Sequence, residues 1–451
     1  MNRSIRNAIH GAILSVLAAA FALPAQAGRY PDLSRETLPA NDGWASLPTE
    51  AFPLGTTGGS AASAERVHVV SDRNALVAAL AYPDPTPKII QVTGVIDANV
   101  DDDNQPLRCD DYVRADPDTG ELYSLEQYLT AYDPATWGRE DEPSGPQERA
   151  RDASADAQTA RIRIRIPPNT TIVGATRNAT IRGAWFDIRP GSGSNNAPAN
   201  VIIRNLTFVD THDCFPAWDP ADGSEGNWNS LYDAISVRNA THVWLDHNAF
   251  LDVETADAGL PTYFGRLYQI HDGLVDITNA SDLVTVSWNL FANHDKAMLI
   301  GSSDSASADR NRLRVTLHHN LLHDLGQRAP RVRFGQVHVY NNLYSISSTG
   351  AEHYAYSWGV GAESQMVAQN NQFLASHGVT SDLFIGGFKG TQLLAEGNAH
   401  NLRAFDPVVA YNAVNDTDIE NGASWAPVLY RRMDPAWLLP LTVTWAAGPL
   451  R

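Results

Sequence analysis

Three aspartates have the residue type and the spacing of a metal site with oxygen ligands. Asp233 stands in the segment Leu231–Ser236, and Asp272 and Asp276 stand four residues apart in His271–Ile277. Carboxylates without a neighbouring cysteine suit a hard, oxygen-seeking cation such as calcium. In an ordinary loop the same carboxylates would cap backbone N–H groups instead. A shared calcium site therefore requires a fold that brings Asp233 close to the later pair.

Four cationic residues are candidates for binding an anion. Lys296 lies in the segment Asn293–Ala297, and Arg328, Arg331 and Arg333 stand within six residues of one another. If this segment is a strand, alternation puts Arg331 and Arg333 on one face. A solvated strand edge would have the same composition. However, the chain has 51 acidic and 33 basic residues, so clustered arginines favour a site for a carboxylate or another anion.

A recurring strand pattern indicates how these residues are brought together. From residue 162 onward, short β-branched units recur, and every unit after the first has an Asn two residues before the apolar or aromatic residue that ends it. In the first unit, Asn205 stands three residues before that end. Because Asn tolerates left-handed backbone angles, we expect it at a tight bend, with stacked copies hydrogen-bonded in a ladder. The units are Val201–Phe208, Val243–Phe250, Val284–Phe291, Val315–Leu322, Val337–Tyr344 and Met366–Phe373.

The spacing of the units favours a parallel β-helix over a β-propeller. From Asn289 the equivalent residues, at positions 320, 342 and 371, lie 31, 22 and 29 residues apart, whereas a propeller blade needs about 40 residues. The two earlier intervals, of 43 and 41 residues, imply either two coils each or loops inserted on one face. A solenoid of small coils buries its core by stacking, and its inserted loops often build the binding face.

The N-terminus predicts export. Two arginines precede the apolar run Ala12–Leu23, and small residues end at Ala27. This pattern is typical of a secretory signal peptide that is cleaved after Ala27, because the alternative, a membrane anchor, needs a longer apolar stretch. We therefore expect a soluble, secreted protein without a membrane partner. Export would permit Cys109 and Cys214 to pair, but the sequence leaves open whether they meet.

Composition and local sequence signals divide the chain into segments. The formal net charge of −18 argues against a nucleic-acid partner, and we expect a monomer. The spacing of Asp72–Tyr82 predicts a helix that caps the first coil, and the acidic stretch after Asp101 is interpreted as a solvated excursion. The predicted segments are the signal peptide 1–27, an irregular lead-in 28–60, the β-helix 61–425 with the acidic insertion at about 101–158, and a C-terminal tail 426–451 that packs on the β-helix.

A series of motifs resembles the extracellular pectate lyases of bacteria, in the family's order, from about Asp133 to Asn371. The resemblance implies an all-β fold, a right-handed, single-stranded parallel β-helix. It also implies calcium as the cofactor, de-esterified polygalacturonate as the substrate, and β-elimination that gives 4,5-unsaturated oligogalacturonides. The matching segments are Gly226–Ser230, Tyr232–Ile235, Val243–His247, His271–Gly273, His294–Lys296, Gly301–Ser305 and Arg328–Asn342.

The resemblance also implies roles for individual residues. Arg328 corresponds to the family's catalytic base, Lys296 and Arg333 to binders of substrate carboxylates, and the three aspartates to the calcium ligands. Elimination removes the C5 proton, which is poorly acidic beside an ionised carboxylate, so positive charge around that carboxylate stabilises the enolate-like transition state. A free guanidinium is almost always protonated, so Lys296 is the alternative base, and activity should rise toward alkaline pH.

Other functions remain open at this point. A glycoside hydrolase would use a carboxylate pair, which the aspartates could supply, but needs no lysine beside three arginines. A pectin lyase, acting on methyl esters, resembles the family without the calcium carboxylates and the lysine. A non-catalytic carbohydrate-binding or adhesion module would explain the repeats, the export signal and the acidity, but gives no reason for the match to a catalytic set. Endo or exo action, preferred chain length and tolerance of methyl esters stay undecided.

Several conspicuous residues are interpreted as structural. Asp246 and His247 stand at a repeat position, where buried polar groups hydrogen-bond to each other. The three histidines between 318 and 323 lack a cysteine or carboxylate at matching spacing and are expected to line the coils. Asp222 is a candidate ligand of a second calcium associated with the substrate.

Overall fold

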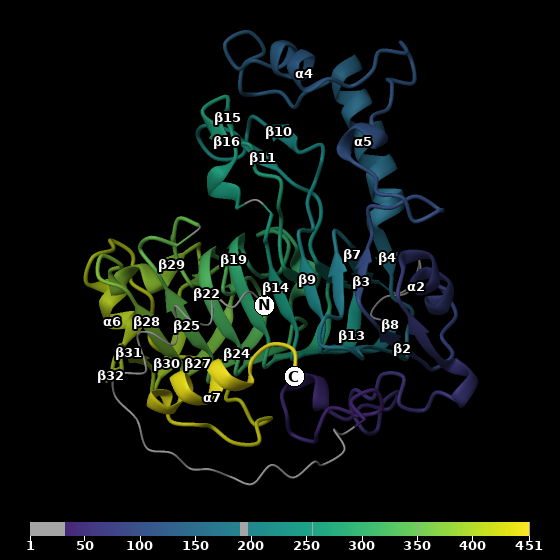
Figure 1. The fold of residues 1–451 in the computed structure, drawn as a ribbon. Helices are drawn as coiled ribbons and strands as arrows, with labels where there is room; N and C mark the ends of the chain where they lie inside the picture. Colours follow the sequence, from purple (N-terminus) through teal and green to yellow (C-terminus); the bar gives the residue numbers. More distant parts are fainter. Residues whose placement is uncertain (1–31, 190–196, 255, 351, 451) are drawn as a thin grey trace. The chain divides into compact units, whose positions relative to one another are not determined.

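Short strands wind through three parallel sheets in a repeated order (Figure 1). The computed structural model describes residues 32–189, 197–254, 256–350 and 352–450, and residues 34–451 form one unit, to which the following description refers. The predicted signal peptide, 1–27, lies outside the described residues. Most coils contribute one strand to each sheet, so the inward side chains of successive coils stack into one apolar core. The all-β, right-handed parallel β-helix is confirmed.

The three sheets are referred to by order along a coil. The first consists of β1 (Val67–Val70), β2 (Lys88–Val92), β5 (Thr170–Gly174), β8 (Ala197–Arg204), β13 (Ala240–Asp246), β18 (Asp282–Ser287), β21 (Val315–His318), β24 (Gln336–Tyr340), β27 (Gln365–Gln369) and β30 (Leu393–Glu396). The second consists of β3 (Val95–Asp97), β6 (Thr180–Arg182), β9 (Thr207–Val209), β14 (Ala249–Leu251), β19 (Leu290–Lys296), β22 (Leu321–Gln327), β25 (Leu343–Ile346), β28 (Gln372–Ala375), β31 (Ala399–His400) and β32 (Arg403–Ala404). The third consists of β4 (Arg163–Arg165), β7 (Trp185–Ile188), β12 (Ile235–Arg238), β17 (Val275–Thr278), β20 (Leu299–Ile300), β23 (Arg331–Val332), β26 (Trp358–Val360) and β29 (Ile385–Gly387).

The predicted asparagine ladder is present at the corner between the first and second sheets. The backbone N–H and the side-chain amide of Asn289 both donate to Oδ1 of Asn320, at 2.9 and 3.1 Å. The same pair of bonds joins each member to the next, and one member, Asn398, had not been assigned from the sequence. The ladder consists of Asn248, Asn289, Asn320, Asn342, Asn371 and Asn398.

The expected left-handed backbone lies one residue earlier than predicted. His247, Trp288 and His319, which directly precede ladder residues, have φ values of 51°, 55° and 55°. The expectation that the recurring Asn itself bends the chain is therefore wrong, because its side chain builds the ladder and its neighbour makes the bend. This also explains the first unit: Asn205, with φ 59°, takes the bend position, and Leu206 takes the ladder position.

Three excursions leave the coils at the corner between the second and third sheets, and they account for the long intervals. Each of the two intervals before Asn289 is one coil with an inserted loop, not two coils. The acidic run 101–104 that opens the insertion after β3 is largely exposed, as interpreted, but the rest of the insertion is folded and shares a buried aromatic cluster with both loops. The inserted elements are α3 (Cys109–Tyr112), α4 (Leu125–Ala131), α5 (Pro146–Ile162), the hairpin β10 (Ala217–Asp219) with β11 (Asn227–Asn229), η3 (Asp257–Gly259), and the hairpin β15 (Thr262–Tyr263) with β16 (Arg266–Leu267).

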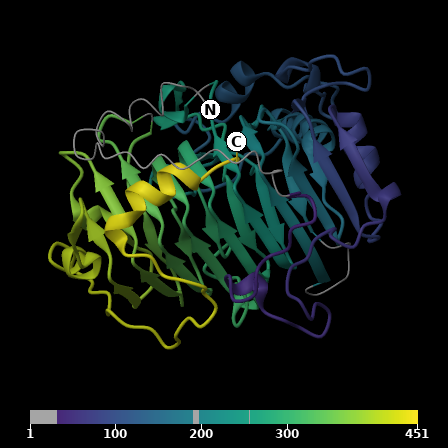
Figure 2. The ribbon, with the colours of Figure 1, turned by 60° about the horizontal axis from the view of Figure 1, so that its bottom comes forward.

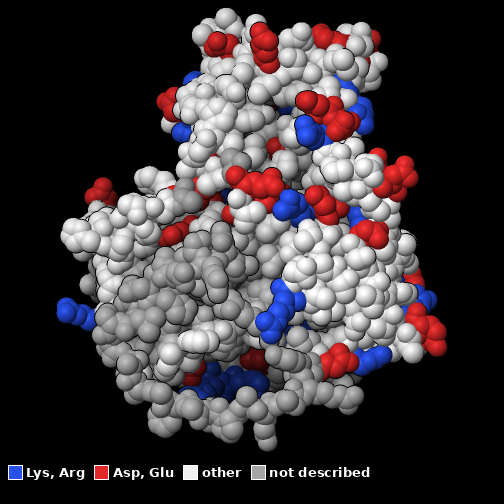
Figure 3. Space-filling view, viewed as in Figure 1, with Lys and Arg blue, Asp and Glu red and all other residues white. Residues whose placement is uncertain are grey.

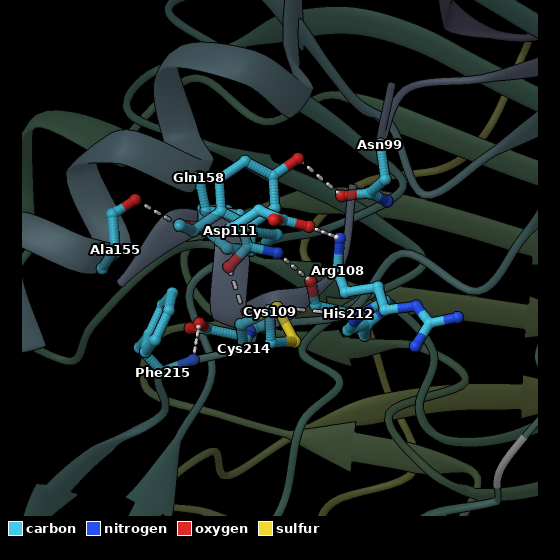
Figure 4. Close-up of a disulfide and its surroundings, with 12 residues drawn as sticks. Asn99, Arg108, Cys109, Asp111, Ala155, Gln158, His212, Cys214 and Phe215 are labelled. Atoms are coloured by element: carbon cyan, nitrogen blue, oxygen red, sulfur yellow. Dashed lines mark hydrogen bonds between the residues drawn. A yellow bond between two sulfur atoms is a disulfide. The ribbon is translucent and has the colours of Figure 1, made fainter. Parts of the chain in front are cut away.

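A disulfide fixes these excursions to one another. Cys109 begins α3, and Cys214 lies in the loop between β9 and β10; their sulfur atoms are bonded at 2.05 Å (Figure 4). The loop is also held by α5, since the Gln158 side chain accepts a hydrogen bond from the Cys214 N–H at 3.0 Å. The pairing that the sequence left open is therefore present, and it ties two insertions that stand over the third sheet (Figure 1).

The remaining elements cover the ends and sides of the coils. The predicted capping helix is confirmed as α2 (Arg73–Leu80), whose first turn is capped by the Asp72 side chain. Leu439 and Val443 of α7 (Leu439–Ala446) pack on the outer face of the second sheet (Figure 2). None of the helices in the described ranges has the length and apolar character needed to cross a bilayer. The other short helices are η1 (Trp44–Ser46), η2 (Ala64–Arg66), η4 (Ser307–Asp309), η5 (Ser381–Phe384), α6 (Pro407–Asn412) and η6 (Ala436–Leu438).

Replacing one ladder residue should destabilise the coils. In Asn320→Ala, the N–H of Asn289 and the carbonyl of Val286 would lose their partners in a dry interior, so we expect the free energy of unfolding to fall by about 2–4 kcal/mol in urea denaturation. Asn415→Ala is the matched control, because Asn415 is exposed and donates one bond to the Tyr411 carbonyl; its cost should stay below about 0.5 kcal/mol. Equal costs would contradict a stabilising role of the ladder.

Candidate active site

The candidate residues lie at the corner where the second sheet turns into the third. Asp233 and Gly273 each stand two residues before the neighbouring strands β12 and β17, and Lys296 ends β19. Parallel pairing aligns Gly273 with Lys296, and Lys296 with Gln327, whose successor is Arg328. Successive coils therefore stack residues that are far apart in the sequence. The stack of Asp233, Asp272, Asp276, Lys296 and Arg328 is called the aspartate column, or the column, below.

Two of the predicted aspartates face each other across a glycine. Asp233 and Asp276 are both buried, and a β-carbon at Gly273 would lie 2.5 Å from Oδ1 of Asp276 and 2.8 Å from Oδ1 of Asp233. The Gly273 N–H and the Ser236 hydroxyl donate to the Asp233 carboxylate, and the Leu299 N–H donates to Asp276 at 2.9 Å. The two carboxylates are thus held in place by the backbone, with a gap that only glycine leaves open.

Burial and mutual repulsion make these carboxylates poor anions on their own. Burial raises the pKa of Asp276 to about 7, the negative charge of Asp272 adds to the rise, and Arg328 and Lys296 oppose it. The pKa of Asp233 is also raised well above its usual range, by burial first and then by the charges of Asp276 and Asp272. Near neutral pH the pair therefore favours either a shared proton or a cation.

Asp272 lies at the rim of this pair. Its side chain is 28% exposed, and its Oδ1 forms an ion pair with Nζ of Lys296 at 3.2 Å. The ligand atoms of the three aspartates do not all lie within 4.8 Å of one another; in the described ranges that spacing is met by Cys109, His212 and Cys214 (Figure 4). The sulfurs of this last group are bonded to each other, so it is a disulfide environment rather than a metal site.

Arg328 presents a donor that the protein leaves without a partner. It follows β22 with a left-handed φ of 57°, an uncommon conformation for a residue with a side chain. Its carbonyl accepts from the Met298 N–H at 2.7 Å, whereas its Nε is buried without a hydrogen-bond partner among the described residues. A buried, unpaired guanidinium nitrogen beside Asp276 is a candidate contact for a bound ligand.

Arg331 and Arg333 share a face, as the alternation predicts. A β-carbon at Gly359 of the next coil would lie 2.8 Å from Cγ of Arg331, and one at Gly361 would lie 2.8 Å from Cγ of Arg333. Both arginines therefore lie over glycines that leave room for them.

The contacts of these two arginines differ. The guanidinium carbon of Arg331 stands 4.0 Å from the ring centroid of Phe388. Arg333 donates from Nε to Asp304 at 2.7 Å and from Nη1 to the Gly301 carbonyl at 2.9 Å. Asp304, which was not assigned from the sequence, therefore fixes the orientation of Arg333.

Comparison with known proteins gives the same family as the sequence motifs. The family model described as pectate lyase matches residues 146–407. The chain is 45% identical to a pectate lyase of Bacillus subtilis over 406 residues, which cover 89% of this chain and 90% of that protein. This chain belongs to the pectate lyase family. It is also 34% identical to pectate lyase E of Dickeya dadantii, over 75% of this chain and 69% of that protein. Among solved structures, a pectate lyase bound to a hexasaccharide superposes with a TM-score of 0.84 at 44% identity, covering 93% of this chain and 99% of that one.

In this member of the family, a buried histidine network supports the aspartate column, and sequence reasoning missed most of it. His294 hydrogen-bonds to Asp252 through Nδ1 and to the Asp272 carbonyl through Nε2, both at 2.7 Å. Burial opposes the charged imidazolium, but the Asp252 carboxylate raises the pKa of His294 to about 9. His271 pairs with Asp257 at 2.7 Å beside it. The motif around Lys296 included His294, but nothing in the sequence connected it to Asp252 in an earlier coil.

The residues interpreted as structural do not join the column. Asp246 binds His247 and Arg204 on the first sheet, as expected of a structural pair. His318 and His319 are buried along the same sheet, where they line the coils as predicted. Asp222 is exposed between β10 and β11, and its role as a ligand stays a prediction.

Filling the gap between the carboxylates should disable the site without unfolding it. Gly273 does not have a positive φ, so Gly273→Ala is allowed by the backbone, but its methyl group would displace Asp233 and Asp276. We expect calcium affinity, measured by titration calorimetry, to fall roughly tenfold or more. Gly259→Ala is the control, because nothing lies within 4 Å of a β-carbon there. Equal calcium binding by the two variants would contradict a metal site at this pair.

Proposed function

We propose that this chain is an exported pectate lyase that cleaves de-esterified polygalacturonate by calcium-assisted β-elimination, giving 4,5-unsaturated oligogalacturonides. The observation that carries the proposal is the buried Asp233 and Asp276 pair, with raised pKa values, next to Lys296 and the unpaired Nε of Arg328. Export is supported by the signal-peptide pattern and by the disulfide, since disulfides persist in oxidising compartments. The hexasaccharide bound to the related structure supports an oligosaccharide substrate.

The residues at the column suit calcium. Asp233 and Asp276 offer only oxygen atoms, Gly273 leaves room between them, and Asp272 lies beside them with a partly exposed carboxylate. Asp233 and Asp276 would hold the ion, and Asp272, whose carboxylate lies outside the 4.8 Å spacing, would complete the ligand set by turning its side chain toward them. Bound calcium would supply positive charge beside the substrate carboxylate, which stabilises the developing enolate.

The protein's own cations would serve the proton transfer and the binding of carboxylates. Arg328 would accept the C5 proton on the buried, unpaired side of its side chain. Because this group accepts a proton only in its neutral form, the rate should rise toward alkaline pH. Lys296 is held by Asp272 at 3.2 Å, and Arg333 by Asp304. Both would contact substrate carboxylates, with Arg333 offering its remaining N–H groups in a fixed plane.

A direct assay separates this function from its rivals. The mature protein is incubated with polygalacturonate, with calcium or with a chelator, and the ultraviolet absorbance of the unsaturated uronate is followed. We expect absorbance only with calcium, and slow turnover of highly methyl-esterified pectin, which lacks the carboxylates for Lys296 and Arg333. Reducing ends without absorbance would indicate a hydrolase, equal rates on esterified polymer a pectin lyase, and binding without turnover a carbohydrate-binding module.

Two conservative variants separate the base from a binder. Arg328→Lys should lose about 10²-fold to 10⁴-fold in kcat, because an ammonium cannot reproduce the position of the guanidinium nitrogen. Arg333→Lys should mainly raise KM, since its interaction with a carboxylate exists in the ground state as well. Arg177→Lys, in an exposed turn away from the column, is the control. Near-normal kcat in Arg328→Lys with none in Lys296→Ala would identify Lys296 as the base.

A further inference from the structure

The edge strand of the third sheet places two arginines in line with the candidate calcium site. In β4, Arg165 pairs in register with Asp187, which pairs with Ser236, which pairs with Asp276. Arg165 therefore occupies the same outward row as Asp276, three strand spacings away, or about 14 Å. Arg163 lies two residues earlier and faces the same side, because Ile164 between them points into the core.

The guanidinium groups of these two arginines have no direct ion-pair partner among the described residues. Neither Arg163 nor Arg165 hydrogen-bonds or pairs with a carboxylate within the described ranges; each guanidinium instead lies over an aromatic ring, Arg163 at 5.6 Å from Trp185 and Arg165 at 5.5 Å from Tyr82. Burial first and then the positive charge of Arg165 lower the pKa of Arg163, and the negative charge of Asp187 opposes this. On the face shown in Figure 3, acidic side chains gather over the upper part.

Beside the two arginines the surface is hollowed. A cavity of about 340 Å³ lies between α2 and β4, and its lining includes Arg73, Arg163, Arg165 and Tyr82. Arg73 is fixed there by bonds from its Nε and Nη2 to the Arg161 carbonyl. The volume falls in the range of pockets for small ligands, about 300–1,000 Å³. Cations, aromatic rings and a hollow of this size suit an anionic sugar, with its carboxylate on the guanidinium groups and its apolar face on a ring.

A chain of contacts connects this patch to the aspartate column. The Trp185 Nε1–H donates to the Ser236 hydroxyl at 2.7 Å, and that hydroxyl donates to the Asp233 carboxylate. Arg238 also lies over Trp185, at 4.8 Å, and is paired with Asp187 at 2.7 Å. Trp185, Asp187 and Ser236 are buried, so this connection runs beneath the surface and ties the position of the patch to that of the column.

We propose that Arg163 and Arg165, with the ring of Tyr82, form a remote binding site for galacturonate units of a long substrate chain. The inference rests on the proposed function and deepens it, because it assigns to the edge of the third sheet a preference for long, de-esterified polymers. A carboxylate that binds about 14 Å from Asp276 belongs to the same chain as the bond being cleaved, so it raises affinity without touching the reacting atoms. Short oligogalacturonides do not span the distance and gain nothing from the site.

The test compares two double variants. The first carries Arg163→Gln and Arg165→Gln together, and the control carries Arg177→Gln and Arg403→Gln together. Both remove two positive charges, but Arg177 and Arg403 are exposed in turns and edges away from the third sheet. We expect the first pair to raise KM for long polygalacturonate roughly threefold to tenfold, as for the loss of exposed charge contacts. The rate on the shortest oligogalacturonide that the wild-type protein cleaves should be unchanged, and the control pair should resemble the wild type on both.

Each other outcome overturns the inference. Equal KM values for the two double variants on long polymer would show that the arginines do not bind substrate. An equal loss on short and long substrates would show an effect on the column rather than a remote site. A wild-type protein that cleaves neither substrate would instead contradict the proposed function, so the two failures are distinguishable.

Discussion

In-register parallel pairing is the interaction on which the whole structure depends. It sets a spacing of about 4.8 Å between equivalent residues of successive coils, and the asparagine ladder keeps this register at one corner. Every functional relationship follows from it: Asp233 meets Gly273 because β12 pairs with β17, and Lys296 meets Gly273 because the next coil continues the column. A shift of one residue in any coil would turn these side chains into the core.

The same stacking brings like charges together, and the resulting repulsion favours the binding of a cation. Burying two carboxylates beside each other raises both pKa values, which destabilises the ionised pair unless a cation or a proton is shared. Lys296 and Arg328 lower the energy of the anions without entering the gap that Gly273 keeps open. The result is a site prepared for a small, hard cation, with basic residues at its rim for an acidic polymer.

The sequence predicted the coils and the composition of the column, but not the connections between coils. Strand alternation and the recurring Asn carry the fold because they repeat within short units, and the motifs around Asp272 and Arg328 carry their own local signal. Contacts between coils do not leave such a signal: the support of His294 by Asp252 and the fixing of Arg333 by Asp304 depend on which residues the stacking brings together. The bend residue was misplaced for a related reason, since Asn suits both a left-handed turn and a side-chain ladder, and composition does not distinguish the two.

The central claim is that burial keeps Asp233 and Asp276 partly protonated near neutral pH. Calcium must displace these protons when it binds. Calorimetric titration of calcium in buffers with different ionisation enthalpies measures the protons released on binding. Because the pKa of Asp276 is about 7, the account predicts net proton release at about pH 6.5 and little or none at about pH 9.5, with affinity rising between them. Identical heats in all buffers at about pH 6.5 would mean that the ligands are already ionised, and would contradict the account.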